Sequence, residues 1–155
     1  MSPIVKFILS LVLCFAVAAI GGLATAKGVT TWYLTLEKPS FNPPSWLFGP
    51  VWTVLYIVMA IAFWKIWTLD PSHVQKNAMI WFGIQLGLNL LWSVLFFYLQ
   101  VPGIALVEIL LMWGAILMTI IKFGALVPWT GYILIPYLLW VSFASLLNAA
   151  IWWLN

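Results

Sequence analysis

The stretch MSPIVKFILSLVLCFAVAAIGG, Met1 to Gly22, decides the fold class of this chain. It holds a single charged side chain, Lys6, in an apolar run that is longer than the hydrophobic region of a typical signal peptide. A helix needs about 20 apolar residues to cross a bilayer. Because the chain that follows is itself strongly apolar, we interpret this run as a first membrane span that is retained.

The composition extends this interpretation to the whole chain. Of the 155 residues, 66% are hydrophobic and 6% are charged, whereas soluble domains carry roughly 25% charged residues. So few charges cannot cover a surface in water. Long unbroken apolar runs, in place of alternating apolar and polar residues, exclude a transmembrane β-barrel. The sequence therefore predicts an all-α membrane protein, a five-transmembrane-helix bundle that forms one domain over residues 1–155.

Prolines, glycines and polar residues separate the predicted spans. A long loop, Ala26 to Ser45, follows the first span. The turn Val101 to Gly103 is tight, so the third and fourth spans are expected to be adjacent and antiparallel. The spans are predicted at Pro3 to Thr25, Trp46 to Leu69, Asn77 to Gln100, Ile104 to Phe123 and Tyr132 to Leu154.

Lysines near the span ends predict the orientation in the membrane. The side of the N-terminus collects Lys6, Lys65, Lys76 and Lys122, and the opposite side collects Lys27 and Lys38. This distribution favours a cytoplasmic N-terminus, with the long loop on the other side of the membrane.

The ionisable residues offer no conventional catalytic or metal site. His73 lies in a polar turn beside Asp70, where a solvated loop residue is a simpler interpretation than a catalytic base. The sequence has no nucleophile elbow, phosphate-binding loop or zinc-ligand spacing. The net charge of +3 is spread over loops and does not form a nucleic-acid patch. We therefore predict no metal, no cofactor and no nucleic-acid partner.

Two residues within the spans need separate interpretations. Glu108 is the acidic residue that falls inside a span, about one turn from its start. We expect its side chain to snorkel to the interface or to pair with a loop lysine, in a structural role. Trp113 lies in the middle of the same span without a polar neighbour nearby, which favours packing or contact with lipid.

Two predicted spans carry polar residues on a single helix face. Helical spacing aligns Gln85, Asn89 and Trp92 in the third span, and Trp140, Ala144 and Asn148 in the fifth. Amides are disfavoured in contact with lipid, so both faces are expected to turn inward. The spacing leaves two interpretations open. One is hydrogen bonding between helices, and the other is a tryptophan-lined cavity with polar anchors, which suits a flat apolar ligand.

Gly83 and Gly87 form a small-xxx-small pattern in the third span. Such a pattern lets two helix backbones approach closely in lipid. It predicts either a homodimer contact through this span or close packing within one chain.

The segment EKPSFNPPSWLFGPVW, Glu37 to Trp52, is unlike the rest of the chain. Its prolines restrict their own backbone and favour an extended conformation at each preceding residue. We therefore expect a stiff connector that is able to cap a cavity within the bundle.

The motifs, taken in order, resemble the translocator protein family, which is also called the tryptophan-rich sensory protein or peripheral benzodiazepine receptor family. From Trp32 onward the chain reads WY…LxKPSFNPPxW…GPVWxxLY, then QLxLNxxW, then PYLxWxxFAxxLN. The resemblance implies a bundle of five transmembrane helices that is commonly dimeric. It also implies a pocket under the long loop for porphyrins such as protoporphyrin IX, for sterols in some members, and for benzodiazepine-type drugs.

By motif match, the resemblance implies that Trp52 and Trp140 face the ligand and take part in light-dependent porphyrin breakdown. That chemistry would be photochemical, because no acid–base residues accompany them. Further ligand contacts are expected at Trp92, Asn89, Gln85, Ala144 and Asn148 in the spans and at Phe41, Pro44 and Trp46 in the loop, where Trp32 and Pro43 also match the family motif.

The chain departs from the family pattern at places that bear on its ligands. Phe41 stands where the family usually has Trp. The sterol motif of animal members needs a tyrosine and then a basic residue after the LN of the fifth span, but the chain reads LNAAIWWLN from Leu147 to Asn155. This argues against high-affinity cholesterol binding and fits a bacterial protein, in the cell membrane rather than the outer membrane.

The resemblance therefore implies an integral membrane receptor for tetrapyrroles, with light-dependent porphyrin degradation as an enzymatic extension. A transporter of porphyrin or sterol-like ligands is the alternative, although few ionisable groups are present to couple transport to an ion. A role in tetrapyrrole or stress regulation is left open.

Overall fold

The computed structural model describes residues 1–155, and every regular element in it is helical. The elements are α1 (Pro3–Val29), the 3-10 turns η1 (Trp32–Thr35) and η2 (Ser45–Leu47), α2 (Phe48–Trp67), α3 (His73–Ser93), the π-helical η3 (Val94–Tyr98), α4 (Pro102–Leu126), α5 (Pro128–Tyr132) and α6 (Ile135–Leu154). Five stretches are long and apolar enough to cross a membrane. The predicted five-helix bundle is confirmed.

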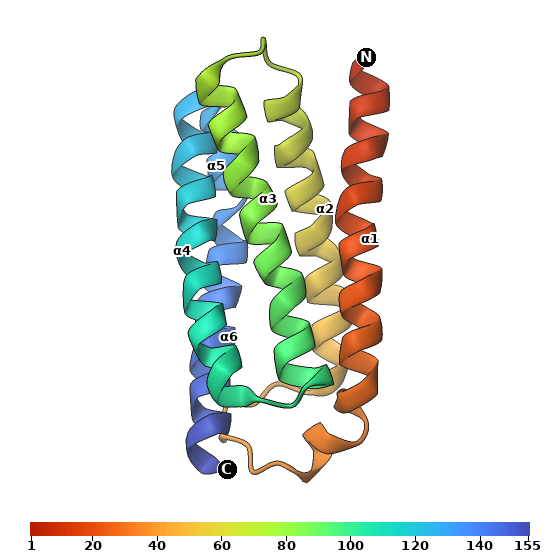
Figure 1. Ribbon diagram of the computed structural model, residues 1–155, viewed down its shortest axis with the longest axis vertical. Helices are drawn as coiled ribbons and strands as arrows, with labels where there is room; N and C mark the ends of the chain where they lie inside the picture. Colours follow the sequence, from red (N-terminus) through yellow and green to blue (C-terminus); the bar gives the residue numbers. More distant parts are fainter.

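The helices run up and down along the bundle, and the two ends of the bundle differ (Figure 1). The N-terminus and the turn between α2 and α3 lie at one end. The long loop between α1 and α2 and the C-terminus lie at the other, which we call the loop end. Among the neighbouring pairs, α3 packs against α4, α1 against α2, and α4 against α6.

The helix boundaries differ from the predicted ones by a few residues, as three places illustrate. The first helix continues to Val29 instead of ending near Thr25. The third begins at His73 instead of Asn77, because Ser72 caps it: the backbone N–H of Gln75 donates to the Ser72 hydroxyl at 3.0 Å. The predicted connection before the last span contains a short helix, α5, with Pro128 in its first turn, where proline is tolerated.

The chain reverses sharply where the third span ends. The helix widens into the π-helical turn η3, and Gln100 then adopts a φ of 59°, in the left-handed region. Phe96 and Phe97 on this turn are buried. At the same place α1 comes so close that a Cβ on Gly28 would overlap the carbonyl oxygen of Phe97.

The interior is filled differently in the two halves of the bundle. Toward the α2–α3 turn, Phe63, Phe82 and Phe123 stack, with ring centroids 4.6 and 5.9 Å apart, inside the main hydrophobic cluster. Toward the loop end, a smaller cluster forms around Tyr33, Phe96 and Phe97. The helices enclose a cavity in this second half.

The structure corrects the prediction for Glu108, whereas for Trp113 it confirms packing and adds a polar neighbour. Glu108 neither snorkels nor pairs with a lysine: it is buried on the inward face of α4, and neither carboxyl oxygen has a hydrogen-bond partner. Trp113 does have a polar neighbour, because its indole N–H donates to the Ser142 hydroxyl on α6 at 2.8 Å. Both residues therefore face neighbouring helices of the bundle.

Candidate functional site

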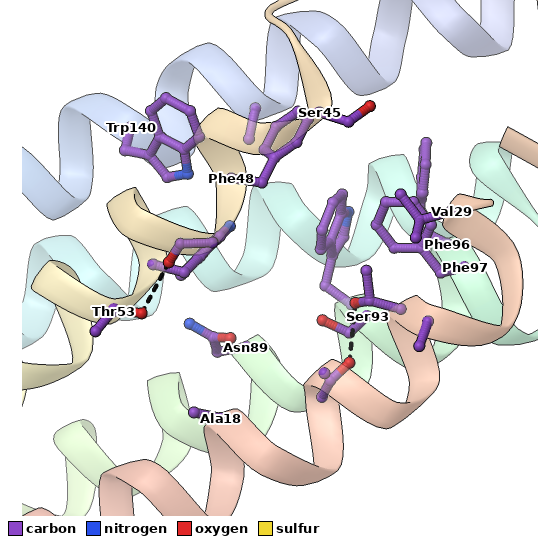
Figure 2. Close-up of a pocket in the computed structure, with 18 of the residues that line it drawn as sticks. Ala18, Val29, Ser45, Phe48, Thr53, Asn89, Ser93, Phe96, Phe97 and Trp140 are labelled. Atoms are coloured by element: carbon purple, nitrogen blue, oxygen red, sulfur yellow. Dashed lines mark hydrogen bonds between the residues drawn. The ribbon is translucent and has the colours of Figure 1, made fainter. Parts of the chain in front are cut away.

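A cavity of about 580 Å³ lies in the loop half of the bundle (Figure 2). Its walls come from α1, α2, α3 with η3, and α6, and the start of the loop contributes Tyr33. Of the 26 lining residues 17 are hydrophobic, and none carries a formal charge. The volume falls within the range of about 300–1,000 Å³ typical of small-molecule sites. The cavity therefore suits a largely apolar molecule, or the apolar part of an amphiphile.

Aromatic rings form two groups on the cavity wall. Trp140 packs against Phe48 and Phe143, with centroid distances of 6.0 and 5.6 Å. Trp92 stacks on Phe96 at 5.1 Å. Figure 2 shows Trp140 and Phe48 on one side of the open space and Phe96 on another. Because these rings pack against one another, they form a rigid surface on which a flat ligand is able to stack.

A hydrogen-bonded network at the base of the cavity joins three helices. Asn89 on α3 is at its centre: the Tyr56 hydroxyl donates to Asn89 Oδ1 at 2.8 Å, and Asn89 Nδ2 donates to the Tyr137 hydroxyl at 2.8 Å. The Tyr137 hydroxyl in turn donates to Gln85 Oε1 at 2.7 Å. Each buried group finds a partner on another helix, which stabilises the bundle and fixes the position of Asn89.

A second polar contact orients Trp92. Its indole N–H donates to Asn148 Oδ1 at 3.0 Å, and Asn148 Nδ2 donates to the carbonyl oxygen of Pro102 at 2.8 Å. This chain of bonds links α3, α6 and the start of α4. The two interpretations left open by the spacing thus both apply, because the polar groups bond between helices and also line a tryptophan-walled cavity.

Trp140 differs from Trp92 in one respect that bears on binding. Its indole Nε1 is buried and has no hydrogen-bond partner. Figure 2 shows this nitrogen on the side of the ring that faces the cavity. A buried donor left unpaired costs about 1–3 kcal/mol. A ligand with a hydrogen-bond acceptor at this point would satisfy the donor.

The cavity has an opening between α1 and α2. On the α1 side the lining residues that are also exposed are Phe15, Ala19, Gly22 and Ala26. Gly49 and Thr53 are their exposed counterparts on α2. We call this gap the side opening. Because it lies along two membrane-spanning helices, it faces the lipid.

Two residues of the loop, Tyr33 and Phe41, pack against aromatic residues that line the cavity. Tyr33 is 2% exposed among Phe96 and Phe97, and its hydroxyl donates to Asn42 Oδ1 at 2.7 Å. Burial raises the pKa of this phenol, and the hydrogen bond to Asn42 partly opposes the shift. Phe41 packs edge-on against Phe143, with centroids 6.1 Å apart. The segment thus covers the loop end as expected, although η1 and η2 make it partly helical.

The structure brings most of the predicted site residues together. Those that line the cavity are Trp52, Trp92, Asn89, Trp140, Ala144 and Asn148. Gln85 lies behind the wall in the polar network, and Phe41 touches the wall through Phe143. Pro44 precedes η2 without lining the cavity, and Trp46 is 72% exposed and lies off its wall. Gly83 and Gly87 lie on the outside of α3.

Several lining residues were not predicted. Phe48 and Tyr56 stand one helical turn before and after Trp52, so the spacing in α2 would have placed all three on one face. The small residues of α1 also follow a helical spacing. Thr25 is the single polar side chain among the lining residues of α1, so this face looked like any other apolar span.

Comparison with known proteins agrees with the motif resemblance. The model of the TspO/MBR family matches residues 10–154. The tryptophan-rich protein TspO of Chlorobaculum tepidum is 45% identical over 144 residues, which cover 92% of this chain and 91% of that protein. The protein of the same name from Archaeoglobus fulgidus is 42% identical over 155 residues, or 98% of each chain. The human translocator protein is 37% identical over 124 residues, which cover 78% of this chain and 73% of that protein.

Proposed function

The chain is an integral, multi-pass membrane protein that belongs to the TspO/MBR family, and on this premise we propose that its cavity binds porphyrins such as protoporphyrin IX and related flat, apolar molecules. The observation that carries this proposal is the unpaired indole N–H of Trp140 inside an uncharged aromatic cavity. A macrocycle supplies the area for stacking, and its π face is able to accept this hydrogen bond.

The absence of charge on the cavity wall also orients the proposed ligand. Carboxylates of a porphyrin would be strongly disfavoured beside apolar side chains. They are better placed toward the loop end, where Lys27 and Lys38 lie. There the ammonium of Lys27 sits 3.9 Å from the ring centroid of Tyr98, and that of Lys38 sits 4.7 Å from the ring of Tyr33. The macrocycle would then lie inward, between Trp52 and Trp140.

The side opening between α1 and α2 supports entry of the ligand from the bilayer. An apolar molecule dissolved in lipid meets this gap without first passing through water. The small side chains of Ala19, Gly22 and Ala26 leave room for a flat ring to slide between the helices. Entry by this route fits a receptor for membrane-partitioned molecules.

The proposal is tested by titrating the purified protein with protoporphyrin IX in the dark and following tryptophan fluorescence. Trp140→Phe keeps an aromatic ring but removes the donor, so we expect the Kd to rise about tenfold, the equivalent of 1.4 kcal/mol. Trp153→Phe is the matched control, because Trp153 is on the same helix, 81% exposed and away from the cavity. Saturable quenching with equal affinity in both variants would contradict the assignment of the site.

Illumination of the same samples tests the enzymatic extension. Trp52 and Trp140 line one cavity, so both are able to contact the proposed porphyrin. New absorbance bands that require light, oxygen and both tryptophans would support porphyrin degradation at this site. A spectrum that stays constant under light would leave a binding protein without this chemistry.

A further inference from the structure

The loop that covers the cavity is bonded almost entirely to itself. Between Thr31 and Pro44, its hydrogen bonds are local ones: Tyr33 to Asn42, Thr35 to Trp32, Lys38 to Leu36, and turns such as Asn42 to Pro39, with Thr31 bonded to the adjacent end of α1. The two that reach a distant element both involve Asn155, which follows α6. The middle of the loop is thus hydrogen-bonded to the bundle through one side chain, while Leu36 packs against the cluster around Tyr33, Phe96 and Phe97.

The geometry of this contact is reciprocal. The backbone N–H of Glu37 donates to Asn155 Oδ1 at 3.1 Å, and Asn155 Nδ2 donates to the carbonyl oxygen of Glu37 at 2.9 Å. The same Nδ2 also donates to the carbonyl oxygen of Ile151 at 2.8 Å. The amide therefore bonds the loop backbone on one side and the last turn of α6 on the other. Ile151 itself is fully buried and lines the cavity.

Glu37 lies between two aromatic residues that hold the loop over the cavity. Tyr33 and Phe41 anchor the loop on either side of it through aromatic packing. The prolines that follow make the segment stiff, so movement at Glu37 is passed along the chain. Beyond them the loop enters η2 and α2, where Ser45 and Gly49 line the cavity next to the side opening. A loop fixed at Glu37 thus also fixes the α2 edge of that opening.

We propose that Asn155 is a positioning residue that fastens the loop over the cavity and slows the exchange of the bound molecule. The slowing of exchange rests on the proposed function, whereas the fastening of the loop does not. Loss of two exposed hydrogen bonds is expected to raise the population of the open loop by about 5- to 30-fold. The buried packing of the helices is untouched, so global stability is expected to stay the same.

The test compares three variants with the wild-type protein in lipid nanodiscs. Asn155→Ala removes both bonds to Glu37, and Asn155→Asp keeps the acceptor but loses the donor. Glu37→Gln is the matched control, because Asn155 bonds only to the backbone of Glu37 and not to its side chain. Hydrogen exchange of the amides in residues 31–44 is measured without ligand, and the dissociation rate of protoporphyrin IX is measured by stopped-flow fluorescence.

We expect Asn155→Ala to speed both loop exchange and porphyrin dissociation by about 5- to 30-fold, with Asn155→Asp in between and Glu37→Gln like the wild type. Unchanged loop exchange in Asn155→Ala would overturn the proposal whatever the ligand does. Faster loop exchange with an unchanged dissociation rate would overturn the control of ligand exchange. If the wild-type protein does not bind protoporphyrin IX, the proposed function is wrong, and the loop measurement still decides whether Asn155 fastens the loop.

Discussion

At the scale of single residues, Gly28 is the glycine at which an added Cβ would have the least room. A Cβ there would overlap the backbone carbonyl of Phe97, and backbone gives way less easily than the end of a side chain. We expect Gly28→Ala to lower the free energy of unfolding by about 1–3 kcal/mol, measured by thermal unfolding in detergent. Gly22→Ala on the same helix is the control, because a Cβ at Gly22 meets no atom within 4 Å. Equal stability of the two variants would contradict this close approach of α1 and η3.

Spacing along one helix identified Gln85, Asn89 and Trp92 as an inward face, but it could not supply their partners. The bonds that fix Asn89 come from Tyr56 and Tyr137, which are 33 and 48 residues away in the sequence. Helical periodicity gives the direction in which a side chain points, not which helix lies opposite. Neighbours across a bundle depend on the packing of whole helices, which no local pattern encodes.

Glu108 shows the same limit of sequence analysis, here in a residue whose prediction was wrong. The sequence places it about one turn from the start of a span, which put the interface within the expected reach of its side chain. The structure turns this residue inward, on the face that also carries the buried Ala105, Ile109 and Met112. Which face of α4 is inward depends on how α3 and α6 pack against it.

At the scale of the elements, the extent of α1 shows why hydropathy misplaces helix ends. The predicted span stops at Thr25, just before the apolar run meets Lys27. The helix continues to Val29 because a lysine at the end of a span is able to keep its ammonium at the interface. Here the ammonium of Lys27 sits over the ring of Tyr98. A charge therefore ends the hydrophobic stretch without ending the helix.

A substitution on the small-residue face of α1 tests whether the proposed ligand enters through the side opening. Gly22 lines the cavity, is exposed, and has no atom within 4 Å of a Cβ built on it. Gly22→Phe would place a ring in the gap between α1 and α2. If the proposed ligand enters from lipid, we expect its association rate to fall about tenfold while the protein stays folded, since the bulk fills open space and not the core.

The measurement is the association rate of protoporphyrin IX with protein in nanodiscs, followed by fluorescence quenching. Leu23→Phe is the control, because Leu23 is the next residue, is 76% exposed and does not line the cavity. An association rate in Gly22→Phe equal to that of the control would show that the ligand enters by another route, such as the loop end.

At the scale of the whole molecule, low charge and long apolar runs were enough to predict the bundle, because only a few architectures satisfy the backbone within lipid. The cavity could not be predicted in the same way. It exists because the aromatic core fills the half of the bundle near the α2–α3 turn, while small residues of α1 leave space in the other half. The six lysines lie toward the ends of the bundle, which fits the predicted orientation without testing it.

The outer face of α3 bears on the assembly of the molecule. A Cβ on Gly83 or on Gly87 would meet no atom within 4 Å, so neither glycine is needed for close packing within one chain. Exposed Ile80, Ile84 and Leu91 flank them on the same helix. Of the two interpretations of the small-xxx-small pattern, the contact with a second copy of the chain is the one that remains, and we propose it here.

This proposal predicts that Gly83→Leu and Gly87→Leu each weaken self-association, by about tenfold or 1.4 kcal/mol, because a large side chain separates two backbones that would otherwise meet. The monomer–dimer equilibrium is measured by light scattering in detergent and by single-molecule photobleaching in liposomes. Gly114→Leu on α4 is the matched control, since a Cβ there also meets no atom within 4 Å. A wild-type dimer that survives both α3 variants, or that is lost only with Gly114→Leu, would move the interface away from α3, and a monomeric wild type would remove the interface altogether.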